Sequence, residues 1–145
     1  MQCVRVEPKG RLKLPPRVLE YIRAFGDDRV FVTSLDGITA RIYPLPVWIH
    51  NEKVLQASGP LAKDARHINL MANMYGEESE IDGNGRIMLP TNLRRDLDLE
   101  GKPVWLSCTK GRVTMMNERQ MQEAFQAARE AAPAALESLE SAGLL

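Results

Sequence analysis

A ten-residue stretch that occurs twice most strongly constrains how this chain folds. The first copy runs from Val6 to Pro15, and the second runs from Ile81 to Pro90, 75 residues later. Both copies place a β-branched residue before a carboxylate, then two variable positions, Gly, Arg and alternating apolar positions that end at Pro. Because a single carboxylate-x-x-Gly-Arg pattern is common by chance, the fixed offset is the stronger signal, and it predicts a duplicated structural unit.

Length and composition set the class of protein. The chain has 145 residues, of which 44% are hydrophobic and 26% are charged, and these values are typical of a globular protein. It has neither an apolar stretch of roughly 20 residues nor a basic-then-apolar start, so we expect a cytoplasmic protein without a membrane span. Cys3 and Cys108 are far apart in the sequence, which predicts neither a disulfide framework nor a thiolate metal site.

The net charge is zero, but the charges are unevenly distributed. Residues 1–17 carry five basic side chains and one carboxylate, whereas residues 118–145 carry five glutamates and two arginines. A zero net charge argues against wholesale adhesion to nucleic acid or membrane. The basic start and the acidic end instead predict that any charged partner binds one region of the chain.

Alternation and turn chemistry predict the elements of the first half. Residues 4–7 and 11–14 alternate apolar and polar side chains on either side of a turn at 8–10, which predicts two strands. In the second strand, Arg11 and Lys13 share the outward face and the leucines share the inward one. The elements expected next are a short helix over 17–24, a hairpin of 30–33 and 38–43 around Asp36-Gly37, and helices over 46–56 and 61–75.

The same order of elements restarts after residue 79. The expected elements are a strand, turn and strand over 80–89, a short helix over 91–97, a hairpin of 104–108 and 112–116, and a helix that opens at Asn117 or Glu118. Thr91 is a plausible cap for the short helix. Pro133 is expected to break or kink the last helix, which is rich in alanine, and the tail beyond it is expected to fray.

These elements predict an α+β, β-rich fold. Each half has four short strands, too few to bury a sheet face alone, so the two halves are expected to close on each other as a pseudo-twofold β-barrel with flanking helices. We divide the chain into a first repeat over 4–48, a helical connection over 49–78, a second repeat over 79–123, and a C-terminal helix and tail over 124–145.

The repeated motifs resemble those of the MraZ family, whose members carry two tandem AbrB-type (SpoVT-AbrB) swapped-hairpin repeats marked by a D-x-x-x-R signature. The matching residues are Glu7–Arg11, Asp82–Arg86 and the intervening Tyr43-Pro44-Leu45-Pro46-Val47-Trp48 segment. The resemblance covers roughly residues 4–125. It implies a nucleoid-associated transcriptional regulator that binds double-stranded DNA at repeated promoter boxes upstream of division and cell-wall genes. It also implies a ring-shaped homo-oligomer.

The basic residues of the first copy are the candidate DNA contacts. DNA binding needs cations at a regular spacing against phosphates and donors that reach base edges. An outward row on two strands and their turn meets this need, and it comprises Arg5, Lys9, Arg11 and Lys13. The alternative is that these side chains form only a solvated face of a two-stranded ribbon, and the resemblance favours DNA.

The second copy is less basic than the first. Arg86 matches Arg11, but acidic residues precede it and Met88 stands where the first copy has a lysine, so we expect the first repeat to dominate DNA affinity. Two roles stay open for Arg86, a DNA contact or a structural bond to Asp82 or to the barrel seam. Glu7 and Asp82 are expected to orient the arginines of their own motifs, because a carboxylate fixes the fork of a guanidinium.

Other classes of function have little support in the sequence. His50 and His67 have no companion at ligand spacing, so we expect no metal site and no cofactor. No nucleophile elbow, phosphate loop or dinucleotide fingerprint is present, and we therefore expect no enzyme activity. The main alternative is an AbrB-type protein-binding module, antitoxin-like or scaffolding, whose acidic C-terminal helix docks a basic partner.

Overall fold

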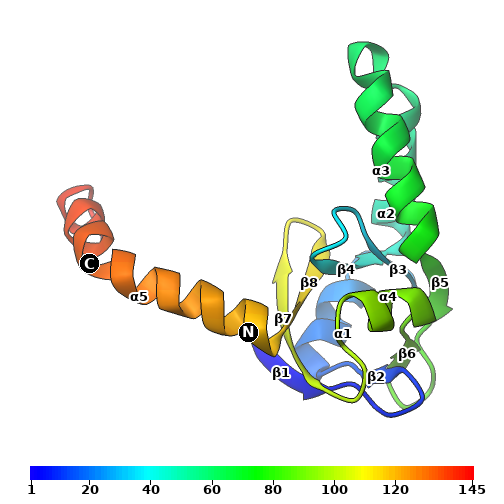
Figure 1. Ribbon diagram of the computed structural model, residues 1–145, viewed down its shortest axis with the longest axis horizontal. Helices are drawn as coiled ribbons and strands as arrows, with labels where there is room; N and C mark the ends of the chain where they lie inside the picture. The colour runs from blue at the N-terminus through cyan, green and yellow to red at the C-terminus, as the bar shows by residue number, and fades with distance from the viewer.

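The two halves of the chain repeat one order of elements in the computed structural model, which describes residues 1–145 (Figure 1). The first half contains β1 (Gln2–Arg5), β2 (Arg11–Lys13), α1 (Pro16–Arg23), β3 (Arg29–Ser34), β4 (Ala40–Pro44) and α2 (Leu45–Gln56). After η1 (Gly59–Leu61) and α3 (Ala62–Tyr75) come β5 (Glu77–Glu80), β6 (Arg86–Met88), α4 (Thr91–Asp96), β7 (Pro103–Thr109), β8 (Arg112–Asn117) and α5 (Glu118–Ser141). The predicted order of strand, turn, strand, short helix, hairpin and helix is confirmed in both halves.

The strands pair across the two halves. A six-stranded sheet has the order β1-β7-β8-β4-β3-β5, so β1 of the first half bonds to β7 of the second, and β5 of the second half bonds to β3 of the first. The two hairpins meet where β4 pairs with β8, and β2 and β6 form a separate two-stranded ribbon. All pairings are antiparallel, and the α+β class is confirmed. Neither half completes a sheet without strands of the other, which explains physically why the unit occurs twice.

The core lies between the six-stranded sheet, the ribbon and the two short helices. In the ribbon, Leu12 is opposite Ile87 and both are buried, as the alternation predicts. α1 contributes Val18 and Ile22 to the same core, and α4 contributes Leu93. Full burial of each such side chain contributes about 1.5–3 kcal/mol. One core therefore ties both halves together, and the ribbon sits on it with its apolar face inward.

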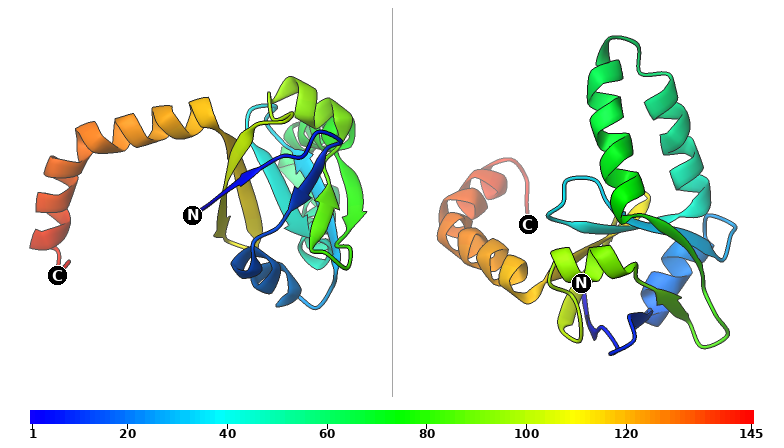
Figure 2. Two further views of the ribbon diagram at one scale, coloured as in Figure 1. Left: turned by 90° about the horizontal axis from the view of Figure 1, so that it is seen from below. Right: turned by 45° about the vertical axis from the view of Figure 1, so that its right-hand side comes forward.

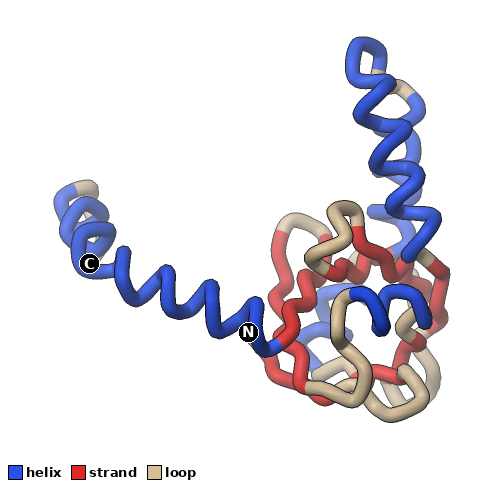
Figure 3. The backbone as a smooth tube through the Cα atoms, viewed as in Figure 1, coloured by secondary structure: helices blue, strands red, loops and turns tan.

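Two helical parts extend away from this body (Figures 1 and 2). The first is the hairpin of α2 and α3, and the second is α5, which leaves the end of β8 in a different direction. The strands are confined to the body, and helices account for more of the chain than strands do (Figure 3). The chain is therefore less β-rich than expected. None of its helices combines the length and apolar character needed to cross a membrane.

The helix ends follow from local hydrogen bonding. The Asn117 side chain accepts from the backbone N–H of Gln120 (2.8 Å), and the Gln120 side chain accepts from the backbone N–H of Asn117 (3.0 Å), so a capping box opens α5. α5 continues through Pro133 to Ser141, so the expected break is wrong, but the helix bends in its C-terminal part, as the alternative of a kink predicts (Figures 1 and 2). Thr91 is not a cap either. α4 begins directly after Pro90, so Thr91 already lies in the first turn, where its hydroxyl accepts from Arg94 (3.1 Å).

Candidate nucleic-acid interface

The outward face of the ribbon gathers most of the predicted basic residues. Because β2 alternates, Arg11 and Lys13 point away from the core that buries Leu12. The antiparallel register sets Arg11 opposite Met88 and Lys13 opposite Arg86, so all four share this outer face. The side chains of Arg11 and Lys13 are exposed and form no hydrogen bond or ion pair within the chain, although the Asp82 carboxylate lies near enough to Arg11 to be stabilised by its charge. Their charges are available to an external anion.

The first signature turn projects Lys9 beside this face. The N–H of Glu7 donates to the carbonyl of Arg11, and the N–H of Gly10 donates to the carbonyl of Glu7, both at 2.9 Å. Gly10 has φ +89°, a conformation that side chains other than glycine's strain to adopt. Lys9 lies at the exposed tip of this turn and makes no bond within the chain. The turn therefore extends the cationic face beyond the end of the ribbon.

The second signature turn has the same backbone pattern with a different side-chain role. Asp82 donates from its N–H to Arg86, and Gly85 donates to Asp82, both at 3.0 Å. In addition, the Asp82 carboxylate accepts from the backbone N–H groups of Arg86 (2.9 Å) and Asn84 (2.8 Å). These bonds, first the one from Arg86, hold the pKa of Asp82 below its ordinary value of 3.8. Asp82 thus stabilises its own turn.

The partner of Glu7 differs from the sequence expectation. Glu7 was expected to orient Arg11, but its carboxylate accepts from Nε of Arg86 in the other half (2.9 and 3.3 Å). The cause is the exchange of strands, which brings β6 beside β2 and Arg86 within reach of the longer Glu7 side chain. Arg86 does not bond the Asp82 carboxylate through its side chain, and the two halves are joined here by an ion pair. Two predictions stay open, a DNA contact by Arg86 and the orienting role of Asp82.

Arg5 lies apart from the ribbon. It is on β1, the edge strand of the six-stranded sheet, where it pairs in register with Pro103 of β7. Its Nη1 donates to the carbonyl of Gly101 (3.0 Å), while the side chain stays exposed. The structure therefore brings together Lys9, Arg11, Lys13 and Arg86, whereas Arg5 extends the basic surface along a neighbouring strand.

Sequence reasoning missed Arg94, a buried cation beneath the first signature turn. Its guanidinium donates to the carbonyl of Leu89 (3.1 Å), to Thr91 (3.1 Å) and to Glu100 (2.7 Å). It packs so closely under Gly10 that a Cβ added there would lie 2.6 Å from its Nε. A signal was present in the repeat, because the residue 75 positions earlier is the apolar Leu19. A charged residue that replaces an apolar one at matched positions indicates a specific polar contact.

The arrangement offers a cationic surface on this ribbon. No group of three or more His, Cys, Asp or Glu side chains lies close enough to hold a metal ion. Guanidinium and ammonium groups that project from a β-ribbon can neutralise phosphates, and arginine can bond a guanine edge in bidentate fashion. The chemistry that this face supports best is recognition of a polyanion.

Comparison with known proteins adds independent evidence. The chain is 36% identical over 100 residues to the transcriptional regulator MraZ of Acidobacterium capsulatum, a match that covers 69% of this chain and 68% of that protein. It is 34% identical over 99 residues to the protein of the same name from Koribacter versatilis, with 68% and 67% covered. With the Thiobacillus denitrificans protein, also named transcriptional regulator MraZ, it shares 32% identity over 138 residues, 92% of this chain and 93% of that one. No family model matches the chain.

These similarities are too extensive to reflect the short signatures alone. The match to the Thiobacillus denitrificans protein spans nearly the full length of both chains, so it includes both halves of the duplicated fold. The resemblance inferred from the two signatures is thereby confirmed. The chain belongs to the MraZ family of transcriptional regulators.

Proposed function

We propose that this regulator binds double-stranded DNA through the outward face of the β2–β6 ribbon and the first signature turn. The observation that carries the proposal is that Arg11 and Lys13 are exposed side by side and neither forms an ion pair, with Lys9 at the adjoining turn. Buried leucines hold the strand beneath them, so the cations are presented from a rigid element. A β-ribbon with outward cations can enter or lie over the major groove.

The first repeat supplies most of the affinity in this proposal. In the second repeat, Met88 replaces the lysine, and the charge of Arg86 is offset by Glu7. Three exposed glutamates of β5 (Glu77, Glu78 and Glu80) add negative charge before the second turn. Phosphates would be repelled there. We infer that the DNA backbone follows β2 and its turn rather than the two repeats equally.

A single subunit offers few contacts, which is why the proposal includes a homo-oligomer. Each phosphate that a cation neutralises adds about 0.9 to the slope of the logarithm of the binding constant against the logarithm of the salt concentration. Three or four such contacts per subunit therefore give only weak binding at physiological salt. Subunits that engage neighbouring promoter boxes together gain roughly a hundredfold or more from avidity. We therefore propose a ring-shaped homo-oligomer that acts on repeated boxes upstream of division and cell-wall genes, in the cytoplasm at the nucleoid and without enzyme activity.

We also propose that the two sheets form a closed pseudo-twofold swapped-hairpin barrel.

The test measures binding to DNA from upstream of the protein's own gene. In fluorescence anisotropy titrations, replacing Arg11 and Lys13 together with Ala is expected to reduce the salt slope by about 1.8 and to weaken binding roughly thirtyfold at 0.15 M salt for each engaged subunit. The matched control is Arg66→Ala, which removes an exposed cation of α3. If the double variant binds DNA as tightly as the wild type, the ribbon is not part of the DNA interface.

The competing function is a protein-binding module that uses the acidic end of α5. One observation favours it, since every residue from Gln122 to Leu145 is exposed and α5 packs on the body only at its start. Deleting residues 130–145 separates the two functions on a duplex that carries a single box, where avidity does not contribute. If the shortened protein still binds this duplex, the DNA function is supported. If neither the full-length nor the shortened protein binds DNA, and the deletion abolishes binding of a protein partner, the module is supported.

A further inference from the structure

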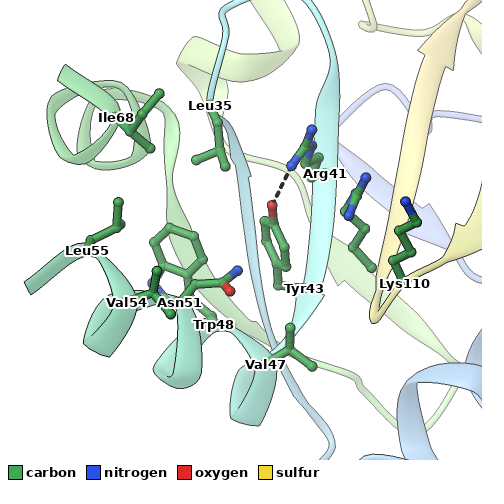
Figure 4. Close-up of a pocket in the computed structure, with 11 residues that line it drawn as sticks. Leu35, Arg41, Tyr43, Val47, Trp48, Asn51, Val54, Leu55, Ile68 and Lys110 are labelled. Atoms are coloured by element: carbon green, nitrogen blue, oxygen red, sulfur yellow. Dashed lines mark hydrogen bonds between the residues drawn. The ribbon is translucent and has the colours of Figure 1, made fainter. Parts of the chain in front are cut away.

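Two adjoining cavities form a groove along the α2–α3 hairpin. The basal cavity, of about 290 Å³, lies where α2, α3 and β4 meet the turn between β7 and β8, and Trp48 and Tyr43 line it (Figure 4). The outer cavity, of about 340 Å³, lies between α2 and α3 and is mostly apolar. Both are lined by Val54, Leu55 and Ile68. We refer to the two together as the α2–α3 groove.

The basal end of the groove is cationic and unpaired. Arg41, Lys110 and Arg112 line it, no carboxylate does, and none of the three is in an ion pair. Arg41 donates to the hydroxyl of Tyr43 (2.9 Å), and Nε of Arg112 is buried without a hydrogen-bond partner. Figure 4 shows Arg41 and Lys110 at one end of the cavity and the apolar Leu55 and Ile68 at the other. A buried donor without an acceptor is costly, so this end fits a ligand that brings an anion.

The C-terminal half of α5 has the complementary chemistry. Leu136 and Leu139 are three residues apart on one side of the helix and are about half exposed. Glu137 and Glu140 adjoin them, and no basic residue follows Arg129. α5 packs on the body only at its start, yet most helices in proteins depend on packing for their stability. This segment therefore has an apolar stripe edged with carboxylates and no surface of its own chain to cover it.

We propose that the C-terminal half of α5 of one copy docks in the α2–α3 groove of a second copy. Leu136 and Leu139 enter the apolar part, and Glu137 and Glu140 reach the cations at the basal end. In the chain itself, α5 and the α2–α3 hairpin leave the body in different directions, so another copy supplies the helix (Figures 1 and 2). Pairing of two α5 tails is disfavoured because it sets glutamates against glutamates.

This contact is heterologous, because the surface that donates the helix differs from the one that receives it. A heterologous contact closes into a ring when the rotation between copies permits it. The inference rests on the homo-oligomer in the proposed function and names the surfaces that hold it together. DNA takes no part in it, since the groove and the ribbon are different surfaces of the subunit.

Charge exchange tests the contact in the full-length protein without DNA. In sedimentation velocity, Glu137→Lys with Glu140→Lys is expected to raise the apparent dissociation constant of the subunits about tenfold or more, and Lys110→Glu to weaken assembly in the same direction. Combining the tail and groove changes is expected to restore assembly in part. The matched control is Arg66→Glu, which reverses a cation of α3 that lines neither cavity, and it is expected to leave assembly unchanged.

Photo-crosslinking identifies the occupant of the groove directly. A photoreactive amino acid replaces Leu139 in one isotope-labelled copy, which is mixed and reassembled with unlabelled copies. Crosslinks from labelled tails to α2 or α3 of unlabelled copies are the expected result. Crosslinks only within one copy, only between two tails, or to another protein would overturn the inference. Unchanged assembly of all the charge variants would also overturn it. The DNA titrations test the proposed function separately, so failure of one proposal can be distinguished from failure of the other.

Discussion

Replacing Glu7 with Gln is expected to tighten DNA binding while it lowers stability. The Glu7 and Arg86 side chains are 39% and 27% exposed, and the ion pair joins the two halves of the chain. Gln keeps an oxygen that can accept from Nε of Arg86 but removes the negative charge. Because water partly screens the pair, the loss of charge should cost about 0.5–1 kcal/mol in the free energy of unfolding.

The gain in affinity follows from the charge that Arg86 recovers. With Glu7 neutral, Arg86 adds one uncompensated cation to the face that already carries Arg11 and Lys13. One further phosphate contact adds about 0.9 to the salt slope of DNA binding. Taking the contribution of this contact as zero at 1 M salt, the slope corresponds to about fivefold tighter binding at 0.15 M salt. Stability and affinity therefore change in opposite directions, which a general unfolding effect does not produce.

Urea denaturation and DNA titrations at several salt concentrations measure the two effects. Glu52→Gln removes the same charge from α2, which lies on the other side of the body from the ribbon, and it is expected to change neither quantity (Figure 1). Glu7→Ala, which also removes the acceptor oxygen, is expected to lower stability more than Gln does. Unchanged or weaker DNA binding by Glu7→Gln, with an unchanged salt slope, would refute the assignment of the ribbon face.

Two further predictions concern the signature turns. Gly10→Ala is expected to cost about 2–4 kcal/mol in urea denaturation, because a Cβ there is strained by φ +89° and meets the guanidinium of Arg94, which three hydrogen bonds hold. Gly26 has φ +85° and open space around it, so Gly26→Ala measures the cost of the backbone conformation alone. Equal losses of unfolding free energy in the two variants would contradict the packing argument. Asp82→Asn tests the lowered pKa of Asp82, whose charge stabilises the fold above pH 3.8 and ceases to do so as pH falls through the lower folded pKa. The stability deficit of this variant is expected to shrink between pH 7 and pH 3, and a constant deficit would argue against the charge.

The parts of the site that sequence could predict depend on local periodicity. A strand alternates its side chains, so the order Arg11, Leu12, Lys13 sufficed to place two cations outside and one leucine in the core. Turn chemistry was equally informative at Asp36, whose carboxylate accepts from the backbone N–H groups of Ile38 (2.9 Å) and Thr39 (2.8 Å) in the predicted hairpin. Each of these features is decided by neighbours a few residues away.

The features that sequence reasoning missed depend on which half supplies the partner strand. The pairing of β2 with β6 sets Glu7 against Arg86, although 79 positions separate them. The same exchange places Arg94 of the second half under the turn of the first, while Leu19 of the first half packs under Gly85 of the second. No periodicity within one half contains this information, because either half could have paired with itself.

Duplication within one chain lets the two signatures divide their roles, and side-chain length explains how. Asp82 is short and bonds the backbone of its own turn, whereas Glu7, one methylene longer, reaches the arginine of the other half. In a dimer of identical signatures, each arginine would meet the same carboxylate, and both would be paired or both unpaired. Here the pair forms once, so Arg86 is held, whereas Arg11 forms no ion pair. The asymmetry between Arg86 and Arg11 therefore follows the difference of one methylene between the two carboxylates, placed where strand exchange brings the two turns together.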